Sequence, residues 1–158
     1  MSKKEKAPPP KFAAQNRKAR FEYEILEKLE TGMVLLGSEV KSLRAGKASI
    51  EEAYAAIDPR SEVYLINANI PEYRFSSYLN HDPKRKRKLL LHGGEIFKLR
   101  QKLKEKGLTL VPLAIYWKDG RAKCELALAK GRRKFDKREA IRRREDRREM
   151  GRVFRKGS

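Results

Sequence analysis

The sequence predicts a mainly β protein with flanking helices, built around a small, partly closed β-barrel and followed by a basic tail. Three observations support this prediction. Short apolar segments recur with the two-residue period of half-buried strands, and one long segment, "GGEIFKLRQKLKEKG", has the period of a helix. The apolar pattern then ends after Ala129. At 158 residues the chain is long enough for one domain with a modest core.

The first third of the chain begins with a predicted flexible arm, residues 1–15, whose three consecutive prolines and four lysines leave little to bury. "FEYEIL" alternates apolar and acidic residues and is predicted as a strand. "ETG" is predicted as a turn, and "MVLL" as a second strand. In "SEVKSLRAG" we expect a short helix that Ser38 caps and Gly46 ends.

The remaining elements follow in the same way. "DPRS" is typical of a hairpin link and separates the predicted strands "AYAAI" and "EVYLINANI". An extended piece, "PEYRFSSY", leads through "KRKRK" to "LLL", and the long helix follows, with Gly107 at its C-terminal stop. "LTLVPLAIYW" and "AKCELALA" form a last hairpin across "KDGR".

About six strands and one substantial helix favour an OB-like β-barrel over residues 16–130. Residues 131–158 are then a basic tail, which we expect to be disordered when free and helical on a partner. The last 29 residues hold 14 Lys or Arg and five Asp or Glu. Their apolar residues are too sparse to bury a continuous stripe.

Charge dominates the composition, with a formal net charge of +19, and favours a polyanionic partner, nucleic acid before a membrane surface. The longest mostly apolar stretch, "LTLVPLAIYW", is too short to span a bilayer. A soluble, cytoplasmic protein without a membrane partner is therefore expected.

Catalytic and metal-binding chemistry has little support in the sequence. His81 and His92 are the only histidines, and Cys124 is the only cysteine. Cys124 alternates in phase with apolar residues of its predicted strand and is expected to be a core thiol, while His92 is expected to have a structural role before the long helix. There is no phosphate-binding loop and no dinucleotide fingerprint. We therefore expect no enzyme activity, no metal and no cofactor.

The binding signals are stronger but ambiguous. "KRKRK" could be a solvated loop, a localisation-type signal or a nucleic-acid contact. Aromatic residues lie on or near the predicted strands, and most of them are expected to pack in the core or across hairpins, with base stacking as the alternative. These aromatic residues are Tyr54, Tyr64, Tyr73, Phe75 and Tyr78.

Several separate motifs then agree with one family. "NRKAR", "GSEVKSLRAGKASI", "PKRKRKLLL", "KGLTLVPLAIYW" and "AKGRRKFDKR" occur in the order and at the spacing of the SsrA-binding protein, small protein B (SmpB), family. The resemblance runs from about Asn16 to Met150.

The resemblance implies an OB-like barrel that binds the tRNA-like domain of transfer-messenger RNA. Protein and RNA would enter the empty A site of a ribosome stalled on a non-stop mRNA, delivered in a complex with elongation factor Tu. The nascent chain would be tagged and the ribosome rescued, with contacts to the small-subunit decoding centre and the mRNA channel. A basic ribosomal protein or general RNA chaperone remains the alternative, followed by a membrane-surface or nuclear interaction protein.

The resemblance also assigns site residues. Contacts to the tRNA-like domain fall on Asn16, Glu30 and Leu90, with a helix cap, a turn residue and a core residue as their respective structural alternatives. By charge alone, phosphate contacts are expected from five further residues. These are Lys18, Lys41, Arg44, Arg87 and Lys88.

In the tail, the family's Gly and Asp-Lys-Arg map to Gly131 and to Asp136, Lys137 and Arg138. Phe135 stands where other members have His or another planar residue, so stacking on ribosomal RNA is retained but an imidazole hydrogen bond is not. Val153 and Phe154 match an apolar pair near the C-terminus. A flexible cationic chain of this kind could fold inside an mRNA channel that holds no mRNA.

Overall fold

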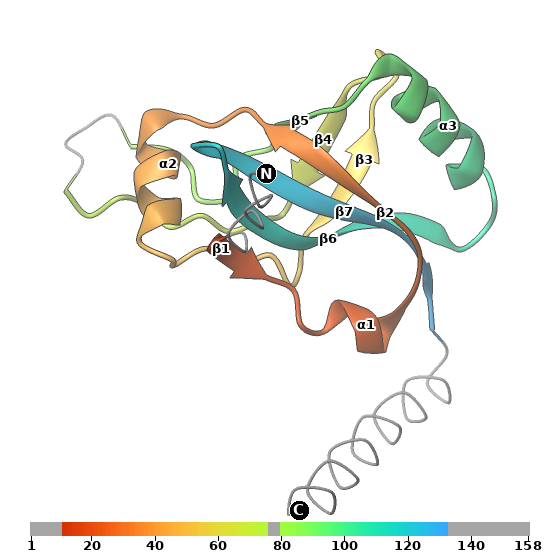
Figure 1. Ribbon diagram of the computed structural model, residues 1–158, viewed down its shortest axis with the longest axis horizontal. Coiled ribbons are helices and arrows are strands. Elements are labelled where there is room, and N and C mark those ends of the chain that lie inside the picture. The colour runs from red at the N-terminus through yellow and green to blue at the C-terminus, as the bar shows by residue number, and fades with distance from the viewer. Residues whose placement is uncertain (1–10, 76–79, 133–158) are drawn as a thin grey trace, which may run out of the picture.

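The computed structural model describes residues 11–75 and 80–132, which form seven strands and three helices. Figure 1 shows the helices arranged around the sheet. In chain order the elements are β1 (Lys11–Gln15), α1 (Ala19–Glu22), β2 (Tyr23–Met33), α2 (Gly37–Arg44), β3 (Tyr54–Ile57), β4 (Val63–Ile66), β5 (Arg87–Leu90), α3 (Gly93–Leu103), β6 (Leu108–Lys118) and β7 (Arg121–Gly131).

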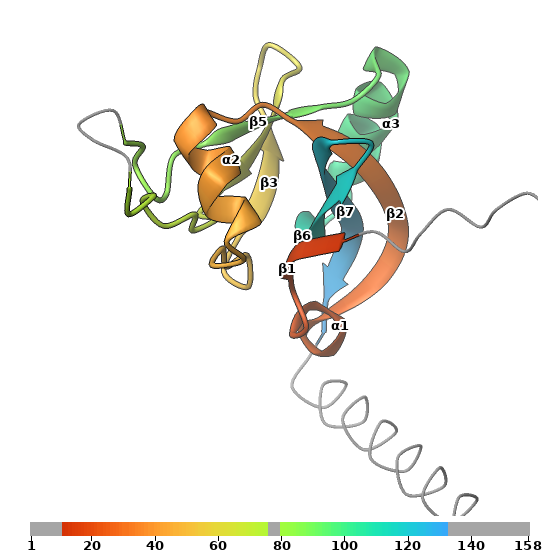
Figure 2. The ribbon, with the colours of Figure 1, turned by 60° about the vertical axis from the view of Figure 1, so that its left-hand side comes forward.

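Six of the strands pair in a closed circuit. The order β6-β3-β4-β5-β2-β7 returns to β6 through the β6–β7 pairing, and every pairing is antiparallel. β1 pairs with the C-terminal part of β6, residues 114–117, where β3 leaves the edge of β6 unpaired. Figure 2 shows the sheet curving around its interior, with α2 and α3 outside it. The predicted mainly β class with flanking helices is confirmed.

The core lies inside this curved sheet and follows from the strand alternation. Val63 and Leu65 on β4 are fully buried, as are Leu110 and Ile115 on β6. Cys124 on β7 is buried among them, as its alternation predicted. Since each strand sends alternate residues inward, the opposite residues remain available for the outer surface.

Two predicted local structures, the last hairpin and the long helix, are confirmed. The β6–β7 hairpin turns at Asp119 and Gly120, both with positive φ (52° and 74°), which suits the twist of a two-residue hairpin. α3 covers part of the core with Leu99, but it ends at Leu103, so Gly107 is not its stop; Gly107, with a φ of 88°, lies in the turn that leads into β6. His92 precedes α3, and its backbone N–H donates to Glu95 Oε1 at 3.2 Å.

The N-terminal boundary differs from the prediction. Residues 11–15 were assigned to the flexible arm but form β1, in which Phe12 lies opposite Tyr116 and Gln15 opposite Ala114. Residues 11–15 were assigned to the arm because the three prolines directly before them dominate the composition of residues 1–15. The partner that orders residues 11–15 is β6, about 100 positions further along the chain.

The segment from Phe21 to Leu36 also differs from the prediction. "ETG" is not a turn but the continuation of β2, and its Gly32 pairs with Lys123 on one side and Leu90 on the other. A glycine between two neighbours of a curved sheet is compatible with a strand, although alone it resembles turn chemistry. "MVLL" is therefore not a second strand, since β2 ends at Met33 and residues 34–36 lead into α2.

The N-terminal end of α2 and the C-terminal end of β7 also differ from the prediction. α2 begins one residue before Ser38, and the N–H of Leu36 donates to Glu39 Oε1 at 2.8 Å. Ser38 is not a cap, because its Oγ lies 2.8 Å from His81 Nδ1. β7 extends to Gly131, opposite Tyr23, so the folded part passes the predicted boundary at residue 130.

Candidate nucleic-acid interface

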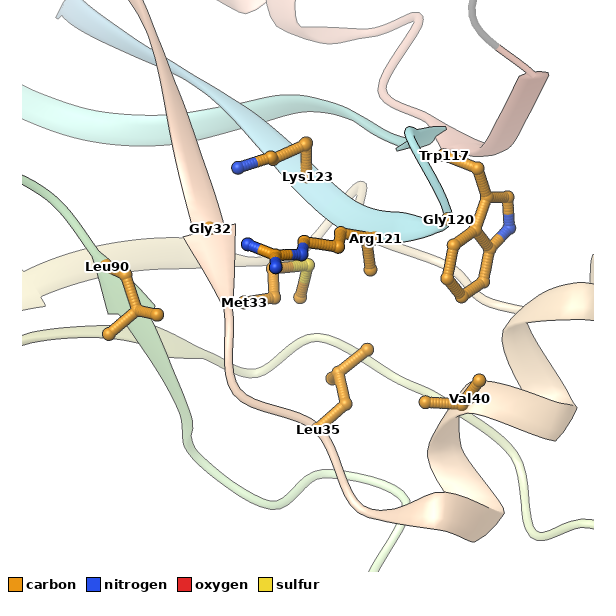
Figure 3. Close-up of a pocket in the computed structure, with 10 residues that line it drawn as sticks. Gly32, Met33, Leu35, Val40, Leu90, Trp117, Gly120, Arg121 and Lys123 are labelled. Carbon is orange, nitrogen blue, oxygen red and sulfur yellow. The ribbon is translucent and has the colours of Figure 1, made fainter.

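An open pocket of about 270 Å³ lies where the end of β2, α2, β5 and the β6–β7 hairpin meet. Its lining is mostly apolar, with two cations, Arg121 and Lys123. Figure 3 shows both cations extending from β7 toward the end of β2. The lining residues are Gly32, Met33, Leu35, Val40, Leu90, Trp117, Gly120, Arg121, Ala122 and Lys123. Apolar surface beside cations suits a base and its phosphate.

Leu90 is the predicted site residue that lines this pocket. It is 51% exposed, so the alternative reading as a core residue is wrong. Leu90 lies opposite Gly32 across the β2–β5 pairing, and a Cβ added at Gly32 would lie 3.3 Å from the Leu90 Cβ. The glycine therefore leaves Leu90 the space that a larger residue would take.

Glu30 lies on β2, two residues before Gly32. Its side chain therefore extends from the side of the strand on which a side chain at position 32 would lie. The Tyr116 hydroxyl donates to Glu30 Oε2, and Lys118 Nζ lies 3.4 Å from Oε1. The Tyr116 hydrogen bond and Lys118 lower the pKa of Glu30. Glu30 is thus an ionised strand residue that orients a neighbouring cation, and the alternative reading as a turn residue is wrong.

α2 presents two of the predicted cations, both exposed. Arg44 places its guanidinium 5.5 Å from the ring centroid of Trp117, which lines the pocket. Lys41 places Nζ 5.5 Å from the ring centroid of Tyr73. The helix therefore brings one cation beside the pocket and another beside a different aromatic residue.

Arg87 is not a surface phosphate contact, and that prediction is wrong. Its side chain is fully buried, and Nε donates to Glu39 Oε2 at 2.5 Å. Nη1 donates to the carbonyls of Ala68 (2.7 Å) and Pro83 (3.0 Å). A phosphate cannot reach a guanidinium that is closed off from solvent and already bonded.

Lys88 is next along β5, on the opposite face, and its side chain is 42% exposed. Its Nζ lies 3.4 Å from Glu62 Oε1, so an incoming phosphate would compete with that carboxylate. Lys88 therefore remains available at the surface, although it is partly neutralised.

Asn16 and Lys18 frame α1. Asn16 is buried, its Nδ2 donates to the Pro112 carbonyl at 3.0 Å, and its Oδ1 accepts from the Ala19 N–H at 3.2 Å. Asn16 therefore bonds the first residue of α1, although Lys18 is the residue directly before the helix, and its contact with RNA stays a prediction. Lys18 is exposed, 3.6 Å from Glu51 Oε2.

The sequence reasoning missed Arg121 and Lys123, and it did not weigh Trp117 as a site residue. A signal was present for Lys123, which alternates with Ala122 and Cys124 on the predicted strand "AKCELALA". Residues out of phase with the core face outward, so Lys123 could have been assigned to the outer face, whereas Arg121 was placed in the link "KDGR".

Of the predicted tail residues, Gly131 ends β7. The others lie outside the described residues: Phe135, Asp136, Lys137, Arg138, Val153 and Phe154.

Other kinds of site find no support within residues 11–75 and 80–132. This part of the chain holds no group of three or more His, Cys, Asp or Glu residues placed to bind a metal ion. Burial raises the pKa of the Cys124 thiol to about 12, so this thiol stays protonated. None of the helices described here is long and apolar enough to cross a membrane.

Comparison with known proteins identifies the family. The model of the SmpB protein family matches residues 13–156. This chain belongs to the SmpB family. It is 56% identical over 146 residues to an SsrA-binding protein of Beijerinckia indica, covering 92% of each chain. It is 54% identical over 145 residues to an SsrA-binding protein of Bifidobacterium longum, again covering 92% of each.

A solved structure agrees with this family assignment. A chain described as "tmRNA-SmpB: a journey to the center of the bacterial ribosome" superposes with a TM-score of 0.65 at 51% identity. The match covers 82% of this chain and 94% of that one. The predicted membership of the SmpB family is therefore confirmed.

Proposed function

We propose that this protein binds the tRNA-like domain of transfer-messenger RNA and accompanies it to stalled ribosomes. One observation carries the proposal: the exposed Leu90 lines an apolar pocket that Arg121 and Lys123 also line. An unstacked base can contact the apolar surface while the cations contact adjacent phosphates. The names of the relatives and the description of the solved chain support the choice of RNA.

Exposed cations extend this surface beyond the pocket. Lys41 and Arg44 lie on α2, Lys18 precedes α1, and Lys88 lies on β5 beside Leu90. They bind phosphates, and Glu30 positions Lys118 at 3.4 Å. Asn16 fixes the start of α1 through its bonds to the Pro112 carbonyl and the Ala19 N–H, and it contacts the tRNA-like domain there.

The tail supplies the second activity. Its 13 Lys or Arg among 28 residues draw it into the RNA-lined mRNA channel of the small subunit, where it becomes helical beyond Gly131. An mRNA in the channel excludes it, which gives selectivity for non-stop complexes. Phe135 stacks on ribosomal RNA, Asp136, Lys137 and Arg138 contact the decoding centre, and Val153 and Phe154 set the register.

In this scheme the protein is a cytoplasmic binding factor and not an enzyme. It needs no cofactor, because it makes and breaks no bond. Elongation factor Tu delivers the complex. The nascent chain is then tagged, and the ribosome is freed.

Equilibrium binding tests the proposal. The full-length protein is titrated with the tRNA-like domain of transfer-messenger RNA and with an unrelated folded RNA that has the same number of phosphates. The proposal predicts a clear preference for the tRNA-like RNA at physiological salt. Equal affinities would instead support a general RNA chaperone or a basic ribosomal protein, because charge attraction does not distinguish folded RNAs of equal length.

A further inference from the structure

A second aromatic surface lies on the segment after β4, away from the pocket. Phe75 is 79% exposed, the largest exposed fraction of any large apolar side chain in the described part of the chain. Its ring meets the Tyr73 ring edge-to-face, with centroids 5.7 Å apart and an interplanar angle of 68°. We call Tyr73, Phe75 and the two nearby cations Lys41 and Arg74 the aromatic platform.

The cations of the platform are held at its rings. Lys41 Nζ lies 5.5 Å from the centroid of Tyr73, and the Arg74 guanidinium lies 6.0 Å from the centroid of Phe75. Glu72 is the single carboxylate within residues 71–75. The platform is therefore net positive around an exposed ring, which favours an anionic partner with a flat face.

The backbone that carries the platform is fixed at two points. Ser42 Oγ on α2 donates to the Pro71 carbonyl at 2.7 Å. Asn80 accepts from the Tyr73 N–H at 3.1 Å and donates to the Tyr73 carbonyl at 3.0 Å. These contacts tie Pro71 to α2 and Tyr73 to Asn80, and the Phe75 ring packs edge-to-face on the Tyr73 ring.

The platform is distinct from the pocket. Val40 of α2 lines the pocket and Arg44 lies over the pocket residue Trp117, whereas Lys41 lies over Tyr73. Neither Tyr73 nor Phe75 lines the pocket. α2 thus contributes to two separate surfaces.

We propose that the aromatic platform is a second RNA-binding site, which stacks one unpaired base on Phe75 and binds the adjacent phosphates with Lys41 and Arg74. Single-stranded RNA binds to exposed aromatic rings flanked by cations, because every base has a face that can stack on the ring while the cations contact the backbone phosphates. A continuous duplex offers no free base face, so the site selects unpaired RNA. The inference rests on the proposed function only for the origin of that base.

The test uses the full-length chain with a short single-stranded oligoadenylate and an RNA duplex that has the same number of phosphates. Phe75→Ala is expected to weaken oligoadenylate binding about tenfold and to leave duplex binding unchanged. Phe75→Trp retains oligoadenylate affinity, whereas Phe75→Leu, which is apolar without a π face, behaves like Phe75→Ala. Phe97→Ala is the matched control, since Phe97 on α3 is 65% exposed and outside the platform.

An unchanged oligoadenylate affinity in Phe75→Ala would overturn the proposal, as would an equal loss on the duplex. A large fall in melting temperature would also overturn it, because Phe75 would then be a structural residue. Phe75→Ala is also tested for binding to the isolated tRNA-like RNA and to small ribosomal subunits. A loss of affinity for one of them identifies the source of the base, and no loss for either would overturn the site. If the parent protein shows no preference for the tRNA-like RNA, the proposed function fails while the oligoadenylate comparison still decides this inference.

Discussion

Arg87 Nε lies 2.5 Å from Glu39 Oε2, and both side chains are completely buried. Arg85 occupies the other oxygen of the same carboxylate at 2.6 Å. The two arginines come from the basic segment before and within β5, while Glu39 lies on α2. The buried ion pair therefore joins the helix that presents Lys41 and Arg44 to the strand that presents Leu90.

Removing Glu39 tests the importance of this ion pair for stability. Glu39→Ala leaves Arg87 as a buried, uncompensated charge, and we expect the free energy of unfolding to fall by about 3–5 kcal/mol in denaturant titrations. The matched control is Glu27→Ala, which removes a 2.5 Å ion pair with Lys102 whose side chains are 47% and 42% exposed. That loss should stay below about 1 kcal/mol. Similar losses in the two variants would contradict the buried role of Glu39.

The same carboxylate should make stability depend on pH. Burial by itself raises the pKa of Glu39, but hydrogen bonds from Arg85, the Leu36 amide and Arg87 outweigh it and lower the pKa below 4.5. Because the folded pKa is depressed, the stabilisation is present above the unfolded pKa and is lost as pH falls through the folded pKa. The stability difference between the parent and Glu39→Gln should therefore shrink on acidification below about pH 4.5. A difference that stays constant or grows would contradict this sign.

Leu90→Asp tests the pocket surface. Leu90 is 51% exposed, so the variant should fold, and a carboxylate in a base-binding pocket should weaken binding to the tRNA-like RNA by about tenfold or more. Binding to unrelated RNA should fall much less. Leu26→Asp is the control, because Leu26 is 46% exposed on β2 but does not line the pocket. Equal effects of the two substitutions on the tRNA-like RNA would count against the pocket.

The tail can be separated from the folded part at Arg132. The Arg132 N–H donates to the Glu22 carbonyl at 2.9 Å and Gly131 pairs with Tyr23, so a chain ending after Arg132 keeps every β7 pairing. We expect this chain to fold and to bind the tRNA-like RNA, somewhat more weakly from lost charge. It should fail to support tagging in a reconstituted non-stop translation assay, because the segment that enters the channel is absent. Full tagging would falsify the role of the tail.

Replacing Asp136, Lys137 and Arg138 together by Ala is the matched control for that truncation. One acidic and two basic groups are lost, so the net charge changes by only −1. Near-normal RNA binding with severely reduced tagging is expected if these residues make specific contacts. Parent-like tagging would mean that only the bulk charge of the tail matters.

The local sequence pattern was sufficient to predict an element where that element is stabilised by residues nearby in the chain. The β6–β7 hairpin followed from alternation around Asp119-Gly120, and α3 followed from Ile96, Leu99 and Leu103 with Gly107 behind them. Motifs in order along the chain identified the family without any structure. Local pattern was insufficient at "ETG", where both neighbours of Gly32 come from distant strands.

By itself, the sequence determined the mainly β class, the principal hairpin and helix, the basic character and the family. Only the tertiary structure decided that Arg87 is buried and that Leu90 is exposed, the reverse of what their side-chain types suggest. Alternation places Arg87 and Leu89 on one face of β5 and Leu90 on the other, but it does not say which face the closed sheet covers. The inner face can hold a guanidinium because folding brings Glu39, 48 positions earlier in the chain, within hydrogen-bonding distance, and a buried charge is tolerated only when it is paired in this way.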